Sequence, residues 1–206
     1  MVNTLGNLPP YSKINSPVID IHYNIVGLPF SRKFAVEELW ERARPVVIQG
    51  VETLTLCPED LLLHLSSHTA IDHGFDNGVM PFFDIARTIE HYHSEIDWTL
   101  LLHRAGQWGL RSCVYLMLSL SKKIAGLSLP EQLCACGMPN FPTDQEVASA
   151  EALVFEGGTP VAPDIARLFG SESLTAKIRY CLQQIFPPKE ALWIVPLPSP
   201  ERPDLG

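Results

Sequence analysis

The first patterned stretch of the chain is Val18–Val26, where apolar and polar residues alternate. Side chains in a β-strand point alternately to opposite faces, so this alternation predicts a strand. Asp20, His22 and Asn24 then share one face, and the apolar residues between them share the other. The polar face is either solvated, as on an edge strand, or part of a functional site. Spacing alone does not choose between the two.

The pattern changes after this stretch. Apolar residues recur at helical spacing over 36–43, which predicts a short helix. Two apolar runs follow at 46–49 and 53–56. They predict a β-hairpin that turns near Gly50.

Helical spacing dominates the rest of the chain. Pro58 followed by two acidic residues is typical of a helix start, Asp97 is a good N-cap, and Thr143 with Glu146 resembles a capping box. Gly109 and Gly126 are typical helix ends. Helices are predicted at 58–70, 81–93, 97–108, 110–125, 143–155 and 172–186.

These elements predict an α+β fold, with a small mixed β-sheet packed on a mainly α-helical domain. The chain divides into a sheet region at 1–56, a helical domain at 57–130, further helices at 131–195 and a proline-rich tail at 196–206. Trp40, Trp108 and Trp193 are interpreted as packing groups.

A second polar group lies on the helix predicted to start at Pro58. Asp60, His64 and His68 are four residues apart and share one helix face, with His73 just beyond. Two imidazoles at this spacing could bind a metal ion, with Asp60 or Asp84 as an oxygen ligand. The alternative is a structural polar cluster, in which histidines at packed helices bond to neighbouring carboxylates. We favour the structural interpretation.

Bulk composition narrows the possible functions. The chain has 206 residues, 15 of them Lys or Arg, and a formal net charge of −8. This charge argues against a dedicated nucleic-acid-binding protein.

Long apolar runs and secretion signals are missing from the sequence, so a cytoplasmic protein without membrane spans is expected. Of the five cysteines, Cys57, Cys113 and Cys181 are expected to be reduced core thiols. The close pair Cys134 and Cys136 is expected to lie on a buried helix and not to bind zinc. The sequence also contains none of the motifs for a Walker phosphate loop, a nucleophile elbow or a dinucleotide fingerprint.

Several ordered stretches carry a family resemblance: "VIDIHYNI", "LTLCPEDLLLHLSSHTAIDH", "FFDIARTIEHYHSEIDWTLLLHRAGQWGL" and "LMLSLSKKIAGLSLP". Together they resemble the uncharacterised nucleotidyltransferases of the polymerase-beta-like superfamily. The resemblance covers roughly residues 17–130. Its most specific parts are the acid-x-His strand, the Pro-Glu-Asp-Leu-Leu helix start and the spacing from Asp84 to Asp97-Trp98.

The resemblance implies transfer of a nucleotidyl group from an NTP to an unidentified acceptor, with two Mg²⁺ ions held by three carboxylates. Asp20 matches the third carboxylate, a catalytic residue and metal ligand. His22 and Asn24 are then expected to contact the nucleotide or substrate. The glycine-containing turn and the first two acidic residues should precede Asp20. Only 19 residues do so, and none of them is acidic.

We therefore expect the chain to be a C-terminal portion of the family domain, with little or no activity by itself. An alternative is a non-catalytic helical module that assembles with another chain or with itself through an exposed sheet edge. A third hypothesis is metal-dependent hydrolysis by His64, His68, His73 and Asp84.

Overall fold

The computed structural model describes residues 8, 10–13, 16–22, 24–25, 35–75, 77–130, 133 and 141–156. Within them the fold is α+β, as predicted: helices build the body of the molecule and one small antiparallel sheet accompanies them.

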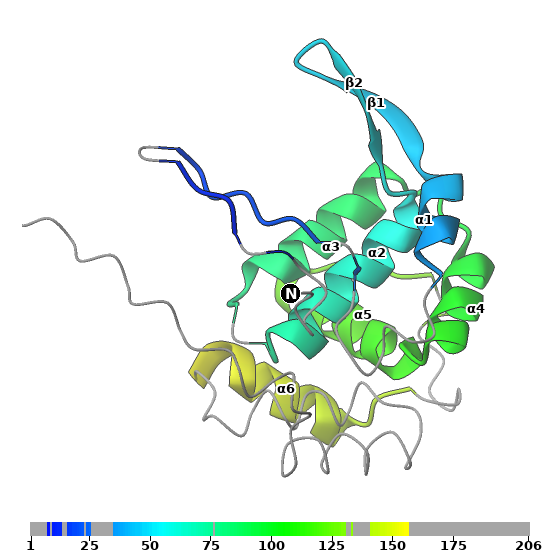
Figure 1. Ribbon diagram of the computed structural model, residues 1–206. Coiled ribbons are helices and arrows are strands. Elements are labelled where there is room, and N and C mark those ends of the chain that lie inside the picture. Colours follow the sequence, from blue (N-terminus) through cyan, green and yellow to red (C-terminus); the bar gives the residue numbers. More distant parts are fainter. Residues whose placement is uncertain are drawn as a thin grey trace, which may run out of the picture.

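The helical body consists of α2 (Pro58–Ser67), α3 (Met80–His91), α4 (Trp98–Trp108) and α5 (Arg111–Ala125), with α6 (Asp144–Glu156) beside them (Figure 1). Helix α5 packs against each of the others, and α2 also contacts α3 and α4. The core therefore lies between α2, α3, α4 and α5. Its fully buried side chains include Leu63, Phe82, Leu101 and Met117.

The predicted helix ends are confirmed at atomic detail. The Asp97 side chain accepts a hydrogen bond from the amide of Leu100, so it caps the N-terminus of α4. Gly109 and Gly126 follow α4 and α5 in the left-handed conformation, which glycine adopts without steric penalty. Before α6, the Thr143 hydroxyl accepts from the amide of Glu146, and the Glu146 carboxylate accepts from the amide of Thr143, which completes a capping box.

The predicted hairpin is present, but it does not pack on the helices as expected. Helix α1 (Val36–Arg42) leads into β1 (Arg44–Ile48), which pairs antiparallel with β2 (Val51–Thr55). Gln49 and Gly50 both have positive φ, as a tight two-residue hairpin turn requires. Most hairpin side chains are exposed, and the hairpin projects from the helical body in Figure 1. The sheet is thus antiparallel and not mixed.

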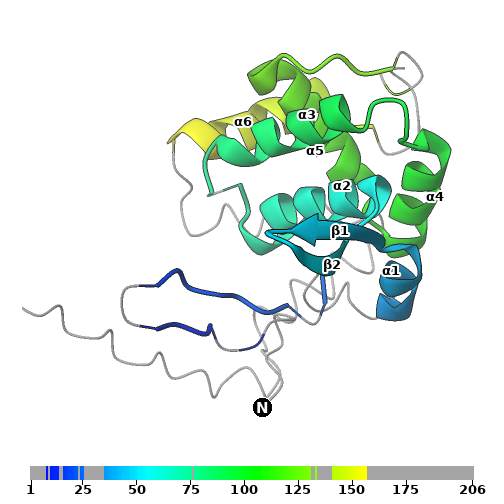
Figure 2. The ribbon, with the colours of Figure 1, turned by 90° about the horizontal axis from the view of Figure 1, so that it is seen from above.

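The strand predicted at 18–26 is not formed as a strand in the described residues. An isolated antiparallel bridge joins Tyr11 to Ile19, and the amide of Leu8 donates to the carbonyl of Ile21. Ile19 and Ile21 are exposed. An alternating pattern gives a stable strand only when its apolar face has a surface to cover. The bridged part of this segment extends away from the helices (Figure 2), and the chain lies against α2 at His22 and Ile25.

Other predictions lie outside the described residues: the helix at 172–186, the tail at 196–206, and three of the cysteines, Cys134, Cys136 and Cys181. Cys57 and Cys113 are buried free thiols, as predicted. In the described part of the chain, every helix is too short or too polar to cross a membrane.

Candidate functional site

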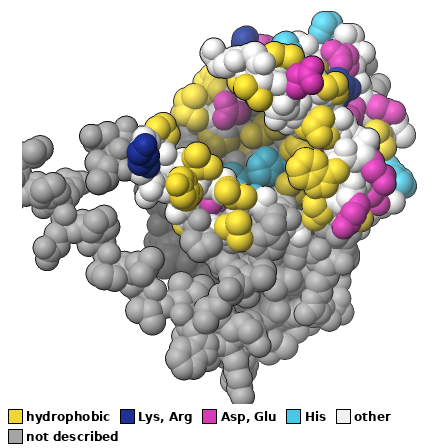
Figure 3. All heavy atoms as spheres, turned by 45° about the horizontal axis from the view of Figure 1, so that its top comes forward, with side chains coloured by type: hydrophobic (Ala, Val, Ile, Leu, Met, Phe, Trp, Pro, Cys, Tyr) yellow, Lys and Arg dark blue, Asp and Glu magenta, His cyan; other side chains and the backbone are white. Residues whose placement is uncertain are grey.

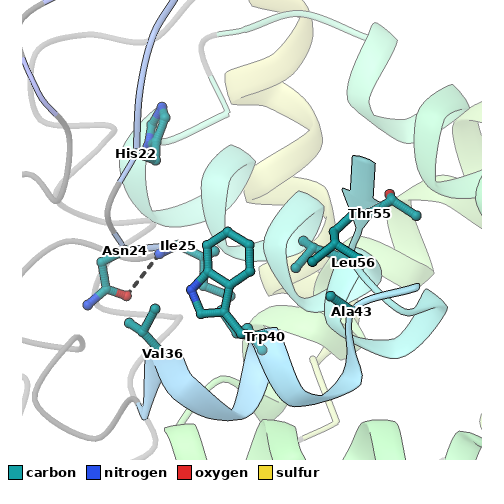
Figure 4. A pocket seen from close by; sticks show the side chains of 10 residues that line it. His22, Asn24, Ile25, Val36, Trp40, Ala43, Thr55 and Leu56 are labelled. Carbon is teal, nitrogen blue, oxygen red and sulfur yellow. Dashed lines mark hydrogen bonds between the residues drawn. The ribbon is translucent and has the colours of Figure 1, made fainter. Parts of the chain in front are cut away.

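A cavity of about 480 Å³ lies between the N-terminal segment, α1 and the end of β2 (Figure 4). Apolar side chains make up most of its wall. Its polar lining residues are His22 and Asn24 from the N-terminal segment and Thr55 from β2. The space-filling view in Figure 3 shows a hollow ringed by hydrophobic side chains, with histidine visible inside it. The lining residues are His22, Asn24, Ile25, Val36, Leu39, Trp40, Ala43, Leu54, Thr55 and Leu56.

Helix α1 presents two different faces, and this explains the position of Trp40. Leu39 is 6% exposed and packs into the core, while the neighbouring Trp40 is 66% exposed and lines the cavity. In Figure 4 the Trp40 indole rises from α1 into the space between the N-terminal segment and Leu56. The expectation that Trp40 is a packing group is therefore wrong, because its ring is largely open to the cavity and solvent.

His22 and Asn24, two of the residues singled out in the N-terminal stretch, line the cavity, and Asp20 lies beside them. Nε2 of His22 is 3.4 Å from Oδ2 of Asp20. The Asn24 side-chain oxygen accepts a hydrogen bond from the amide of Ile25. The spacing of two residues thus keeps Asp20 and His22 on one side of the extended segment, as the alternation predicted.

The imidazole of His22 packs against the two histidines of α2. Its ring lies edge-on to His64 and His68, at centroid distances of 6.5 and 5.9 Å. His64 and His68 stack at 5.4 Å, as residues four apart on a helix can. We call His22, His64, His68 and His73 the histidine cluster. It contains four of the chain's seven histidines.

His73 joins this cluster because α2 continues as a π-helical turn, His68–Asp72. The amide of His73 donates to the carbonyl of His68, a bond that spans five residues. Nε2 of His73 lies 3.1 Å from Nε2 of His68, and Nδ1 of His68 lies 3.2 Å from Oδ2 of Asp72. Neither the π-helical turn nor the pairing of His68 with Asp72 was predicted from the sequence.

The pKa of His64 is lowered to about 4, mainly by burial and also by the neighbouring His68 and His22, while Asp72 opposes the shift. Nδ1 of His64 is shielded from solvent, and the backbone of Ile25 interacts with this imidazole. At neutral pH the His64 imidazole is therefore uncharged.

Asp60 and Asp84, the suggested oxygen ligands, are not brought to the histidines. The Asp60 carboxylate is fully buried and pairs with Arg42 and Arg104. Asp60 and His68 share a helix face but lie about 12 Å apart along the helix axis. Asp84 is exposed on α3, and its carboxylate has no ion pair among the described residues. The hypothesis of metal-dependent hydrolysis by His64, His68, His73 and Asp84 therefore lacks support for its carboxylate ligand.

The family model described as uncharacterised nucleotidyltransferase matches residues 8–126. This range includes the cavity, the Asp20–His22 pair and the histidine cluster. Curated proteins and solved structures gave no match. Since the match covers more than half of the 206 residues, the chain belongs to the uncharacterised nucleotidyltransferase family.

Proposed function

We propose that the chain takes part in Mg²⁺-dependent transfer of a nucleotidyl group from an NTP to an acceptor, in the manner of polymerase-beta-like enzymes. Asp20 is the metal ligand and catalytic carboxylate of this proposal, and His22 and Asn24 contact the nucleotide. One observation carries it: in a chain of this family, His22 lines the cavity and pairs with Asp20.

The cavity has the size and chemistry that a nucleoside needs. Its volume of about 480 Å³ falls within the roughly 300–1,000 Å³ of most small-molecule sites. Trp40 offers an aromatic face on which a base can stack. Ile25 and Leu54 add apolar wall. The base therefore occupies the apolar part, which directs the phosphates towards His22.

Asp20 is accessible to an incoming ion. Its side chain is 46% exposed, and one of its oxygens faces His22. Mg²⁺ prefers carboxylate oxygens and keeps several water ligands, so a half-exposed carboxylate suits it. Oδ2 of Asp20 faces Nε2 of His22 at 3.4 Å, which leaves Oδ1 for the ion.

Turnover by a two-metal mechanism requires more carboxylates than Asp20. Asp72 is another acidic residue beside the histidine cluster, but its carboxylate pairs with His68. The proposal for the chain by itself is therefore Mg²⁺-dependent nucleotide binding with little or no turnover. We also predict that this chain assembles with a second chain that supplies further acidic residues. Light scattering of the purified protein measures its molar mass in solution and so shows whether it assembles.

The test is titration of the full chain with a fluorescent ATP analogue, with Mg²⁺ and with EDTA. Binding should require Mg²⁺ and weaken at least tenfold in Asp20→Asn. Trp40→Ala should weaken binding in the presence of Mg²⁺, because it removes the stacking face. Glu52→Gln, an exposed carboxylate change on β2, is the matched control and should bind like the unmodified chain.

Two results would contradict the proposal. One is Mg²⁺-independent binding that Asp20→Asn leaves unchanged, and the other is no binding of any of the four NTPs at millimolar concentration. Pyrophosphate release, measured in parallel, tests the expectation that the chain by itself has little or no turnover. Robust turnover by the purified chain would show that Asp20 has acidic partners elsewhere in it.

A further inference from the structure

Three histidines of one continuous segment meet on one face because of the π-helical turn. In a regular α-helix, positions five apart lie about 140° away from each other around the axis. The five-residue bond from His73 to His68 changes this and brings the two rings to a centroid distance of 4.5 Å. Single π-helical turns inside helices are frequent at functional sites. The nucleotide site proposed above does not use His64, His68 or His73.

The His68–His73 pair already has the spacing of two ligands on one ion. Their Nε2 atoms are 3.1 Å apart. With metal–nitrogen bonds of about 2.0–2.1 Å, an ion between them subtends an angle of about 100°, between the octahedral and tetrahedral values. Without an ion, these two nitrogens form a hydrogen bond with each other.

Asp72 prepares His68 for this role. Its carboxylate faces Nδ1 of His68 at 3.2 Å, so Nδ1 carries the proton and the lone pair is on Nε2, the nitrogen that faces His73. Histidines that bind metals commonly donate their other ring N–H to a carboxylate in this way. Asp72 thus acts as a positioning residue and leaves the ion to nitrogen ligands.

His64 is the nearest source of a third nitrogen. Its ring stacks on that of His68 one helical turn away, at a centroid distance of 5.4 Å. Two histidines four residues apart on a helix are a common zinc-binding arrangement. Within the described part of the chain, no set of three or more ligating side chains is already close enough to hold an ion, so the His64 ring must turn towards the pair on binding.

We propose that His64, His68 and His73 bind one divalent transition-metal ion of the Zn²⁺ type, with Asp72 positioning His68. Imidazole nitrogens favour such ions over Mg²⁺ or Ca²⁺, which take oxygen ligands. The site differs in residues and in metal from the proposed nucleotide site. The two touch through His22, whose ring lies against those of His64 and His68. A bound ion would therefore fix the surface on which His22 rests.

The test uses the full chain, stripped with EDTA and titrated with ZnCl₂ by calorimetry. Co²⁺ added in place of Zn²⁺ reports nitrogen coordination through its visible absorption. One equivalent of Zn²⁺ should bind and raise the thermal midpoint. His68→Gln and His73→Gln should each weaken binding at least tenfold, and Asp72→Asn roughly 10- to 100-fold. His103→Gln, an exposed histidine on α4, is the matched control and should bind normally.

The exposed His73 keeps this test decisive, because its replacement should leave the fold intact, and far-UV circular dichroism in EDTA checks this. Absence of binding at 100 µM Zn²⁺, or equal binding by His73→Gln and His103→Gln, would overturn the proposal. Asp20→Asn separates the two sites, since it should weaken Mg²⁺-dependent nucleotide binding at least tenfold and leave Zn²⁺ affinity unchanged.

Discussion

Nε of Arg104 lies 2.8 Å from Oδ1 of Asp60, and the two side chains are 4% and 0% exposed. Arg42 approaches the other oxygen of the same carboxylate, with Nε 3.0 Å from Oδ2. The Arg104 guanidinium also stacks over the ring of Trp108. One buried carboxylate thus joins α1, α2 and α4. Because α1 carries Trp40, this contact holds one wall of the cavity against the helical body.

Asp60→Ala should destabilise the protein by about 3–5 kcal/mol, because it leaves two guanidinium groups without their buried counter-charge. The loss is measured as a lower free energy of unfolding in urea. Glu90→Gln is the control: it removes the exposed ion pair with Arg87 and should change stability by less than about 1 kcal/mol. Equal effects of the two substitutions would show that burial of the Asp60 pair does not matter.

Gly126→Ala should lower the free energy of unfolding by about 1 kcal/mol. Gly126 ends α5 with φ of +70°, and an added Cβ would meet nothing within 4 Å, so the expected loss comes from the backbone conformation alone. Gly126→Asn should lose less, since asparagine tolerates the left-handed region better than alanine. Thermal or urea unfolding of the two variants provides the comparison. An alanine variant as stable as the parent would rule out this explanation.

Asp97→Ala should lower the free energy of unfolding by about 1 kcal/mol through loss of the α4 cap. Asp97→Ser should keep most of the stability, because a serine oxygen can accept the same bond from the amide of Leu100. The amide of Asp97 donates to the buried carboxylate of Glu59, and neither substitution removes that amide. Urea unfolding distinguishes the variants. Identical losses for alanine and serine would point to the charge and not to the cap.

Cys57 should ionise only at strongly alkaline pH in the folded protein. The pKa of its thiol is raised to about 11, mainly by burial; a hydrogen bond from the Asp60 backbone opposes the shift, while the Asp60 and Glu59 carboxylates contribute to it. Alkylation by iodoacetamide, followed by mass spectrometry of the Cys57 peptide, should therefore be slow at pH 8 and fast only after unfolding. Rapid reaction at pH 8 without denaturant would contradict the burial of Cys57.

The same shift predicts how stability depends on pH. An unfolded cysteine releases its proton near pH 8.5, whereas folded Cys57 keeps it up to about pH 11. Between these values the folded state binds more protons, so the free energy of unfolding falls as the pH rises. Cys57→Ala should make this decline shallower. The measurement is urea unfolding at intervals from pH 8 to pH 11.

Helices and their ends could be predicted from the sequence because their causes are local. Asp97, Gly109 and Gly126 act within one turn of the helix that they begin or end. The hairpin turn at Gln49 and Gly50 is equally local. The strand at 18–26 could not be predicted in the same way, since a strand depends on a partner and on a surface to cover, and alternation encodes neither.

In the candidate site, too, local features could be predicted from the sequence and long-range contacts could not. The sequence determined that Asp20 and His22 share a face and that His64 and His68 share another, because periodicity within a single element sets both. Only the tertiary structure decided that these faces meet, that a π-helical turn adds His73, and that Asp60 turns to Arg42 and Arg104. These outcomes depend on contacts between segments far apart in the chain, and the burial of charge and apolar surface that selects such contacts is a property of the whole fold.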